Sequence, residues 1–343
     1  MTAVTLAASA CLGGWGGTAE ALDACLRERR PAHRQPALLA VPGFLESSFN
    51  PLVREVARRC LERVAVRPAP ESGTAGAATA IVLGSVLGDT TTADLASRQL
   101  AAGQPGNALL FYQSIPNSIL GFVSREFGIT GPISCVASTD RLAADLLATA
   151  ALTLADDGIE QVLAIGVELA ANPRSELVFA QLSAAGQAVG PPAWDTAVAV
   201  LLRRAAPAAA PADRDRVTIE PPGEHPPGPP GSGPGSTAAY VLLPAPADRD
   251  SSPTAVQVST GALDGAGSVQ GLVHLCLAHE HMRRRDEPAV ALVHDTTMDG
   301  RPLCVLRRHP EPAVSGAGAG TEADRQETAG EVAVSRRGTA DDW

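Results

Sequence analysis

The segment from Asn107 to Glu168 constrains the fold of this chain more than any other stretch. It opens with a helical pattern in which Asn117 and Gly121 lie four residues apart, and a tight Gly-Ile-Thr-Gly-Pro turn follows at 128–132. After the turn come a short apolar run, a helix with leucines at helical spacing and a second apolar run, at 133–136, 142–154 and 161–167. Strand, helix and strand in this order are typical of a βαβ crossover in a buried parallel sheet, so the segment predicts an α/β fold.

The composition narrows the range of functions. The chain has 343 residues, of which 45% are hydrophobic, so it can bury a sizeable core. Its net charge of −10 makes nucleic acid and anionic membrane surfaces unsuitable partners. Apart from histidine, every basic side chain is Arg. A chain without Lys cannot use Schiff-base chemistry or a Walker-type phosphate lysine, which excludes two classes of enzyme.

Neither a metal nor a cofactor is predicted. The six cysteines are scattered, without a C-x-x-C pair or a His/Cys cluster at metal-ligand spacing. The glycines at 13–17 do not fit the G-x-G-x-x-G pattern of dinucleotide-binding proteins. The sequence begins without a signal-peptide pattern and contains no apolar run of membrane-spanning length, so we expect a cytoplasmic protein with reduced thiols.

Strands and helices are also predicted outside the opening segment. Helical patterns occur at 18–29, 50–64, 90–101, 109–123 and 175–185. The second of these helices is expected to start at Asn50, which can cap it, with Pro51 in its first turn. Apolar runs predict strands at 3–11, 78–84, 195–202, 239–243, 255–259, 289–294 and 302–307, a possible edge strand at 216–220, and a Met-Asp-Gly turn at 298–300.

The opening segment resembles the nucleophile region of the thiolase-fold β-ketoacyl synthases. In that family an N-x-x-x-G helix, a G-x-x-G-P turn and a strand lead to a Cys at the start of a long buried helix. Aligning Gly131 and Pro132 without a gap puts Asp140 at the position of the Cys nucleophile. The resemblance therefore implies that the nucleophile has been lost.

A second stretch, at 259–281, resembles the family's K-S-x-x-G-H-x-x-G-A-A-G-x-x-G-L segment. The match puts Gln257 at the family's Lys position and Ala262 at its His position. The family's other His lies in a P-H-G-T-G-T loop, which has no counterpart in this sequence. Decarboxylative condensation needs a thiolate to hold the acyl chain and His groups to stabilise charge, so the resemblance implies a catalytically deficient protein.

The resemblance implies a thiolase-like layered α/β/α/β/α fold with a complete N-terminal half and a shortened C-terminal half. We expect a ketosynthase-like first half at 1–204 and a shortened second half at 238–308. A Pro/Gly-rich insert at 205–237 and a tail at 309–343 have compositions typical of flexible or disordered segments.

Within the family, the pattern is similar to that of chain length factors, the ketosynthase β subunits of type II polyketide synthases, and it resembles the polyene type among them. The implied partners are a catalytic ketosynthase, in a heterodimer, and an acyl carrier protein. The implied chain-length residues are Leu110, Phe111, Tyr112, Gln113 and Ser114. The implied dimer-interface residues are Asn117, Gly121, Ile133 and Cys135.

Simpler interpretations stay open beside these. Asp140 has the features of a helix N-cap, and the aromatic pair at 111–112 has those of core packing. Cys135 is expected to be a buried thiol, and His274, His279 and His281 to be surface or helix-end side chains. The function alternatives are an autonomous thiolase-fold enzyme, such as a malonyl decarboxylase or acyltransferase, and a purely structural or carrier-docking module.

Overall fold

The computed structural model describes ten stretches of the chain. They are residues 4–28, 38–64, 78–187, 190–204, 217–220, 238–244, 256–259, 265–284, 289–295 and 302–308. The predicted turn at 298–300, the tail at 309–343 and the Pro/Gly-rich insert, apart from 217–220, lie outside them. Among the described helices, none is both long and apolar enough to cross a membrane.

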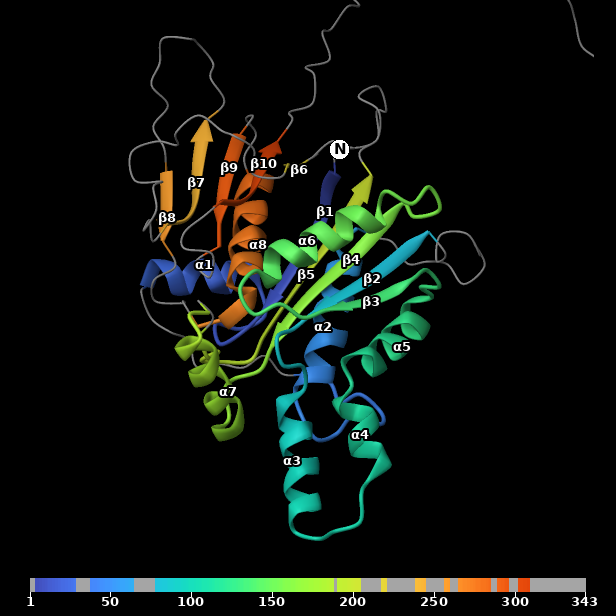
Figure 1. Ribbon diagram of the computed structural model, residues 1–343. Helices are drawn as coiled ribbons and strands as arrows, with labels where there is room; N and C mark the ends of the chain where they lie inside the picture. The colour runs from blue at the N-terminus through green and yellow to red at the C-terminus, as the bar shows by residue number, and fades with distance from the viewer. Residues whose placement is uncertain are drawn as a thin grey trace, which may run out of the picture. The chain divides into compact units, whose positions relative to one another are not determined.

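Ten strands form one sheet (Figure 1). The strands are β1 Val4–Leu12, β2 Thr79–Gly84, β3 Ile133–Val136, β4 Gln161–Glu168, β5 Thr196–Arg204, β6 Val217–Glu220, β7 Ala238–Pro244, β8 Val256–Ser259, β9 Ala289–His294 and β10 Pro302–Arg308. Their spatial order is β3-β2-β4-β5-β1-β6-β10-β9-β7-β8. If β6 to β10 are counted as the first to fifth strands of a second half, both halves have the order 3-2-4-5-1, and their first strands meet in the middle.

Most helices belong to the first half. The helices are α1 Ala19–Glu28, α2 Phe49–Glu62, α3 Thr90–Ala101, α4 Ala108–Ser114, α5 Pro116–Phe127, α6 Leu142–Thr153, α7 Pro173–Ala184 and α8 Gln270–Arg283, with a short 3₁₀ helix, η2, at Gly267–Val269. In the described part of the second half, η2 and α8 are the helices. The layered α/β fold expected from the sequence is therefore confirmed.

Two apolar cores lie on opposite faces of the sheet. One core contains the inward side chains of α6 and α8, and the other contains those of α2 and α5 (Figure 1). The strands explain this arrangement, because every residue of β4 is buried and both of its faces need cover.

The helix predicted over 109–123 is interrupted at Ile115. This residue is extended, with φ −81° and ψ 119°, because the ring of Pro116 disfavours helical geometry in the residue before it. Pro116 then occupies the first turn of α5, where its missing N–H costs nothing. The result is two helices, α4 and α5, that meet at a bend.

Two predictions about element ends and edges are wrong. Helix α2 starts at Phe49, and the Asn50 amide does not cap it but donates to the backbone oxygen of Gln113, 3.4 Å away. Strand β6 is not an edge strand, since it pairs with both β1 and β10. The sequence of a short strand such as 217–220 does not indicate which strands lie beside it, because tertiary contacts decide which strands pair.

Gly166, in the middle of β4, lets the second half pack closely on the first. A Cβ atom at this position would lie 2.5 Å from Cδ1 of Leu272 and 2.9 Å from Cγ1 of Val269. Because Gly166 has no side chain, α8 and η2 can approach the sheet closely at this point.

Replacing Gly166 with Ala should lower the free energy of unfolding by about 1–3 kcal/mol, because the added methyl group overpacks a buried contact. Urea unfolding of the purified chain measures the change. Gly121→Ala is the matched control, since nothing lies within 4 Å of its added Cβ and Ala favours a helix. Equal stability of the two variants would show that Gly166 does not set this packing distance.

Candidate functional site

The candidate site lies where three parallel strands end at the same edge of the sheet. Strand β2 pairs in parallel with both β3 and β4, and the strands end at Gly84, Val136 and Glu168. Loops that follow the carboxyl ends of parallel strands meet at one edge, which is where α/β proteins place their ligands. The loop at 137–141 leads from β3 into α6 at this edge.

Glu168 is a buried carboxyl group that joins the two halves at this edge. Its Oε1 atom accepts hydrogen bonds from the backbone N–H of Val86, at 2.8 Å, and from the hydroxyl of Ser268 in η2, at 2.5 Å. Burial raises the pKa of Glu168 to about 7, despite the two donors that favour its ionised form. The sequence contained one signal for this group, an acidic residue at the end of an apolar strand.

Asp140 lies in the loop before α6 and is exposed. Among the described residues, its carboxylate has one hydrogen-bond partner, the Ser138 hydroxyl at 3.4 Å. Asp140 does not cap α6, because the N-cap position belongs to Arg141, which makes no side-chain cap bond. The N-cap interpretation of Asp140 is therefore wrong, and no imidazole or thiol contacts its carboxylate in the described part of the chain.

The positions that correspond to the family's Lys and His add no catalytic group to the described site. Gln257 lies in β8, opposite Val241 of β7, and Ala262 lies outside the described residues. Within the described stretches, no group of three or more His, Cys, Asp or Glu side chains could hold a metal ion.

Two of the three histidines of α8, His274 and His279, are buried rather than at the surface, which corrects the prediction for them, whereas His281 near the helix end is half-buried. His274 is hydrogen-bonded through Nε2 to the Gln270 amide, 2.9 Å away, and through Nδ1 to the backbone oxygen of His294, at 2.8 Å. Burial lowers the pKa of His279 to about 3, so its ring is neutral. The near-uniform apolar character of α8 around these residues was the signal that they lie in the core.

Cys135 is an exposed residue of β3, not a buried thiol. Its sulfur donates a hydrogen bond to Oδ1 of Asn117 in α5, so two of the four interface candidates are in contact. Loss of hydration around the sulfur raises the pKa of Cys135 to about 11. The thiol is therefore protonated at neutral pH and unsuited to attack a thioester.

Strand β3 and helix α5 form an exposed surface at one end of the sheet. β3 is the first strand in the sheet order and pairs only with β2 among the described strands. Ile133 is 40% exposed, and the space around Gly121 is open. An exposed strand edge beside an apolar side chain invites pairing with another protein.

The five chain-length candidates in α4 differ in how far their side chains are buried. Leu110 and Gln113 are buried, Ser114 is half-buried, and Phe111 and Tyr112 are 68% and 48% exposed. The Tyr112 ring lies against Phe44, with ring centroids 5.8 Å apart. The aromatic pair at 111–112 therefore does not form a buried core.

A groove runs between α3 and α4, which lie side by side beyond the end of the sheet (Figure 1). It has a volume of about 530 Å³ and is lined by Leu100, Phe111 and Ser114 among others. Leu100 is 60% exposed, so two large apolar side chains border this groove. The sequence did not indicate that α3 takes part.

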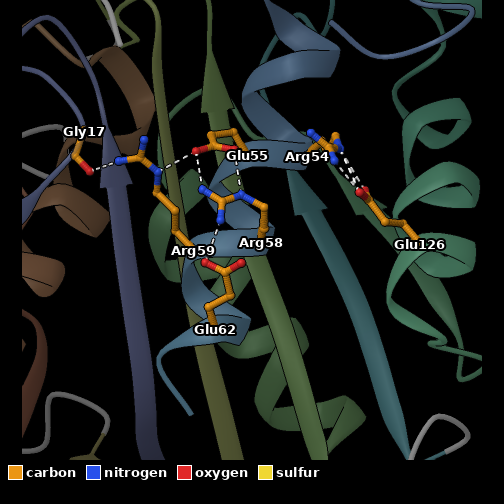
Figure 2. Close-up of polar contacts among 7 residues, drawn as sticks. All are labelled: Gly17, Arg54, Glu55, Arg58, Arg59, Glu62 and Glu126. Carbon is orange, nitrogen blue, oxygen red and sulfur yellow. Dashed lines mark hydrogen bonds and ion pairs between the residues drawn. The ribbon is translucent and has the colours of Figure 1, made fainter. Parts of the chain in front are cut away.

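Helix α5 is held in place by α2. Figure 2 shows Arg54 of α2 facing Glu126 of α5, and the Arg54 Nε atom lies 3.0 and 2.9 Å from the two carboxylate oxygens. The same helix carries Glu55 between Arg58 and Arg59, with contacts of 2.7 Å to each. The Arg54–Glu126 pair therefore ties the helix that bears Asn117 and Gly121 to α2.

Comparison with known proteins shows which fold this geometry represents. Residues 47–193 match the family model of the β-ketoacyl synthase N-terminal domain. Three solved structures align over 89–90% of this chain and over 99% of the matched chain in each structure. The chain has the fold of the β-ketoacyl synthases. The family resemblance inferred from the sequence is thus confirmed for the fold and for the matched residues.

The similar structures are distant in sequence. The ishigamide ketosynthase/chain length factor is 14% identical, with a TM-score of 0.56. The complex of the type II polyketide acyl-carrier protein AntF with its ketosynthase AntDE, bound to the hexaketide, is 11% identical, with a TM-score of 0.55. The complex of the ketosynthase ApeO with its chain length factor ApeC, from Xenorhabdus doucetiae, is 15% identical, with a TM-score of 0.52. No curated protein matches the chain in sequence.

Glu168 should make the stability of this ketosynthase-like chain depend on pH. Its pKa is about 7 in the folded protein against an ordinary value of 4.5, so the folded state binds the proton more tightly than the unfolded chain. Stability should therefore fall as pH rises from 4.5 to 7. The loss attributable to Glu168 is up to about 3 kcal/mol, and Glu168→Gln should remove it.

Urea unfolding of both proteins across this pH range measures the effect. The variant keeps an amide oxygen that can accept from Val86 and Ser268, so the difference between the two proteins isolates the charge. Parallel pH profiles for the two proteins would show that Glu168 is not the titrating group.

Proposed function

We propose that this chain is the non-condensing, chain-length-determining subunit of a ketosynthase heterodimer. It pairs with a catalytic ketosynthase, completes the acyl tunnel between the two subunits, and limits the length of a polyketide or polyene chain carried on an acyl carrier protein. The observation that carries the proposal is Asp140, an exposed carboxylate at the position of the family's Cys nucleophile.

The chemistry at the site supports a role without catalysis. A carboxylate that attacked a thioester would form an anhydride that water cleaves, and its deacylation would need a base. The described neighbourhood of Asp140 offers the Ser138 hydroxyl, which is a poor base at neutral pH. The protonated Cys135 thiol does not replace the missing nucleophile.

The exposed surface of β3 and α5 supports pairing. It offers an unpaired strand edge, the apolar Ile133 and the open backbone at Gly121, and a partner strand could add to this edge. The Arg54–Glu126 ion pair fixes the surface in advance, which lowers the ordering cost of association. The similar solved structures include ketosynthases in complex with a chain length factor.

The groove between α3 and α4 supports the role in chain length. Phe111 lies on its wall, and its exposed ring would be covered once the partner closes the tunnel. A large ring at this point would end the space available to a growing acyl chain.

Introducing a charge at the strand edge should prevent pairing. Ile133→Arg places a guanidinium in the proposed interface, and its burial without a partner should weaken binding on the order of a hundredfold or more. Co-purification with a co-expressed catalytic ketosynthase, followed by calorimetry, measures the loss. The matched control is Leu177→Arg in α7, since Leu177 is 68% exposed and lies outside this surface. Equal binding by both variants would contradict the proposed interface.

Shortening the side chain at position 111 should lengthen the product. In the reconstituted pair with carrier protein, Phe111→Ala removes the ring that limits the tunnel, so mass spectrometry should find longer chains at a similar total turnover. Leu177→Ala is the control and should leave the product unchanged.

Two further measurements with the same pair separate a chain-length subunit from an autonomous enzyme. The chain without its partner should form no product and release no carbon dioxide from a malonyl carrier protein, and Asp140→Asn should leave the products of the pair unchanged. Decarboxylation or acyl transfer by the chain alone would favour the autonomous enzyme.

A further inference from the structure

A cavity away from the site described above is lined by two buried thiols. Its volume is about 370 Å³, and its wall includes Ser9 and Cys11 of β1, Gly17, Arg59 of α2 and Arg63 just after it, and Cys276 of α8. Figure 2 shows Arg59 reaching the backbone oxygen of Gly17 at this place. The side chains of Arg59 and Arg63 are 27% and 29% exposed, so the cavity has a polar rim that reaches solvent.

The two thiols form a pair. Cys11 and Cys276 belong to the same apolar core, and both are almost fully buried. The Cys276 sulfur is also 3.4 Å from the Ser9 hydroxyl, whose oxygen lies 2.8 Å from Nδ1 of His279. Ser9 and Cys11 lie two residues apart in β1 and so share one face of the sheet, which means that the Cys276 sulfur that reaches Ser9 also faces Cys11. Both thiols line the same cavity, so they are placed as neighbours, which disulfide formation requires.

The surroundings make the two sulfurs unequal. The hydrogen bond from Cys11, that of Ser9 and the charge of Arg63 lower the pKa of Cys276, whereas the same thiol contact and burial raise the pKa of Cys11. Cys276 is therefore the better nucleophile of the pair, and Cys11 is the thiol placed to resolve its oxidised form.

The pair also lies across the boundary between the two halves of the fold. Cys11 belongs to β1 of the first half and Cys276 to α8 of the second. An ion pair of 2.7 Å between Arg63 and Glu280 bridges α2 and α8 at the same place. A covalent bond between these two sulfurs would join the halves.

We propose that Cys11 and Cys276 form a dithiol site that a small hydroperoxide converts reversibly to a disulfide. The Cys276 thiolate attacks the peroxide, so that an S–O bond forms, the O–O bond breaks and an alcohol or water leaves. The Cys11 sulfur then attacks the resulting sulfenic acid, an S–S bond replaces the S–O bond, and a second water leaves with the Cys11 proton. The two thiols lose two hydrogens in total, and a dithiol reductant restores them. This proposal does not depend on the proposed function.

Peptide mapping of the full-length chain tests the proposal. The reduced protein is treated with hydrogen peroxide, free thiols are alkylated before denaturation, and the digest is searched for cross-linked peptides. We expect a link between Cys11 and Cys276 that dithiothreitol removes. Because Cys25 shares a tryptic peptide with Cys11, up to Arg27, fragment ions must place the bond on Cys11.

Matched variants separate the pair from the other thiols. Cys276→Ser and Cys11→Ser should abolish the link, whereas Cys25→Ser and Cys304→Ser should retain it. Cys304 is as buried as Cys11, and burial alone raises its pKa.

The map of the unmodified chain decides the question even if a variant fails to fold. A link from Cys276 to Cys60, both thiols remaining free in the folded protein, or a link that forms only in denaturant would each overturn the proposal.

Discussion

The complete burial of β4 is the constraint on which the rest of the fold depends. Every residue of this strand is buried, as are the first seven of β5 beside it, so apolar side chains leave both faces of the sheet. Each fully buried Val, Leu or Ile is worth about 1.5–3 kcal/mol, which the sheet gains only if helices cover both sides. Helices α2 and α5 cover one face, and α6 and α8 cover the other. The site loops then lie at the edge where these layers meet.

Local patterns were enough to predict the elements and the fold, but not the relations between distant segments. The βαβ segment, Pro116 and the motif around Gly131 are contiguous in sequence, so periodicity and spacing indicate them directly. The central place of β6 and the burial of His279 depend on contacts with segments far away in the chain. Composition alone therefore suggested that β6 is an edge strand and that His279 lies at the surface.

The candidate site shows the same division. Its position followed from Asp140, because strand ends and motif spacing are local features. The role of Glu168 was not predicted, because its partner Ser268 lies 100 residues away. The directions of Phe111 and Cys135 were also misjudged, since an apolar side chain in an α/β protein is usually buried, and only the structure shows that β3 ends the sheet.

The seam between the two halves determines how they are held together. Strand β1 shares eight residue pairs with β5 but two with β6, so the ladder across the middle of the sheet is short. Cohesion of the halves thus comes chiefly from side chains around α8 rather than from backbone hydrogen bonds. Deletions in the second half that spared this helix would therefore leave the first half intact.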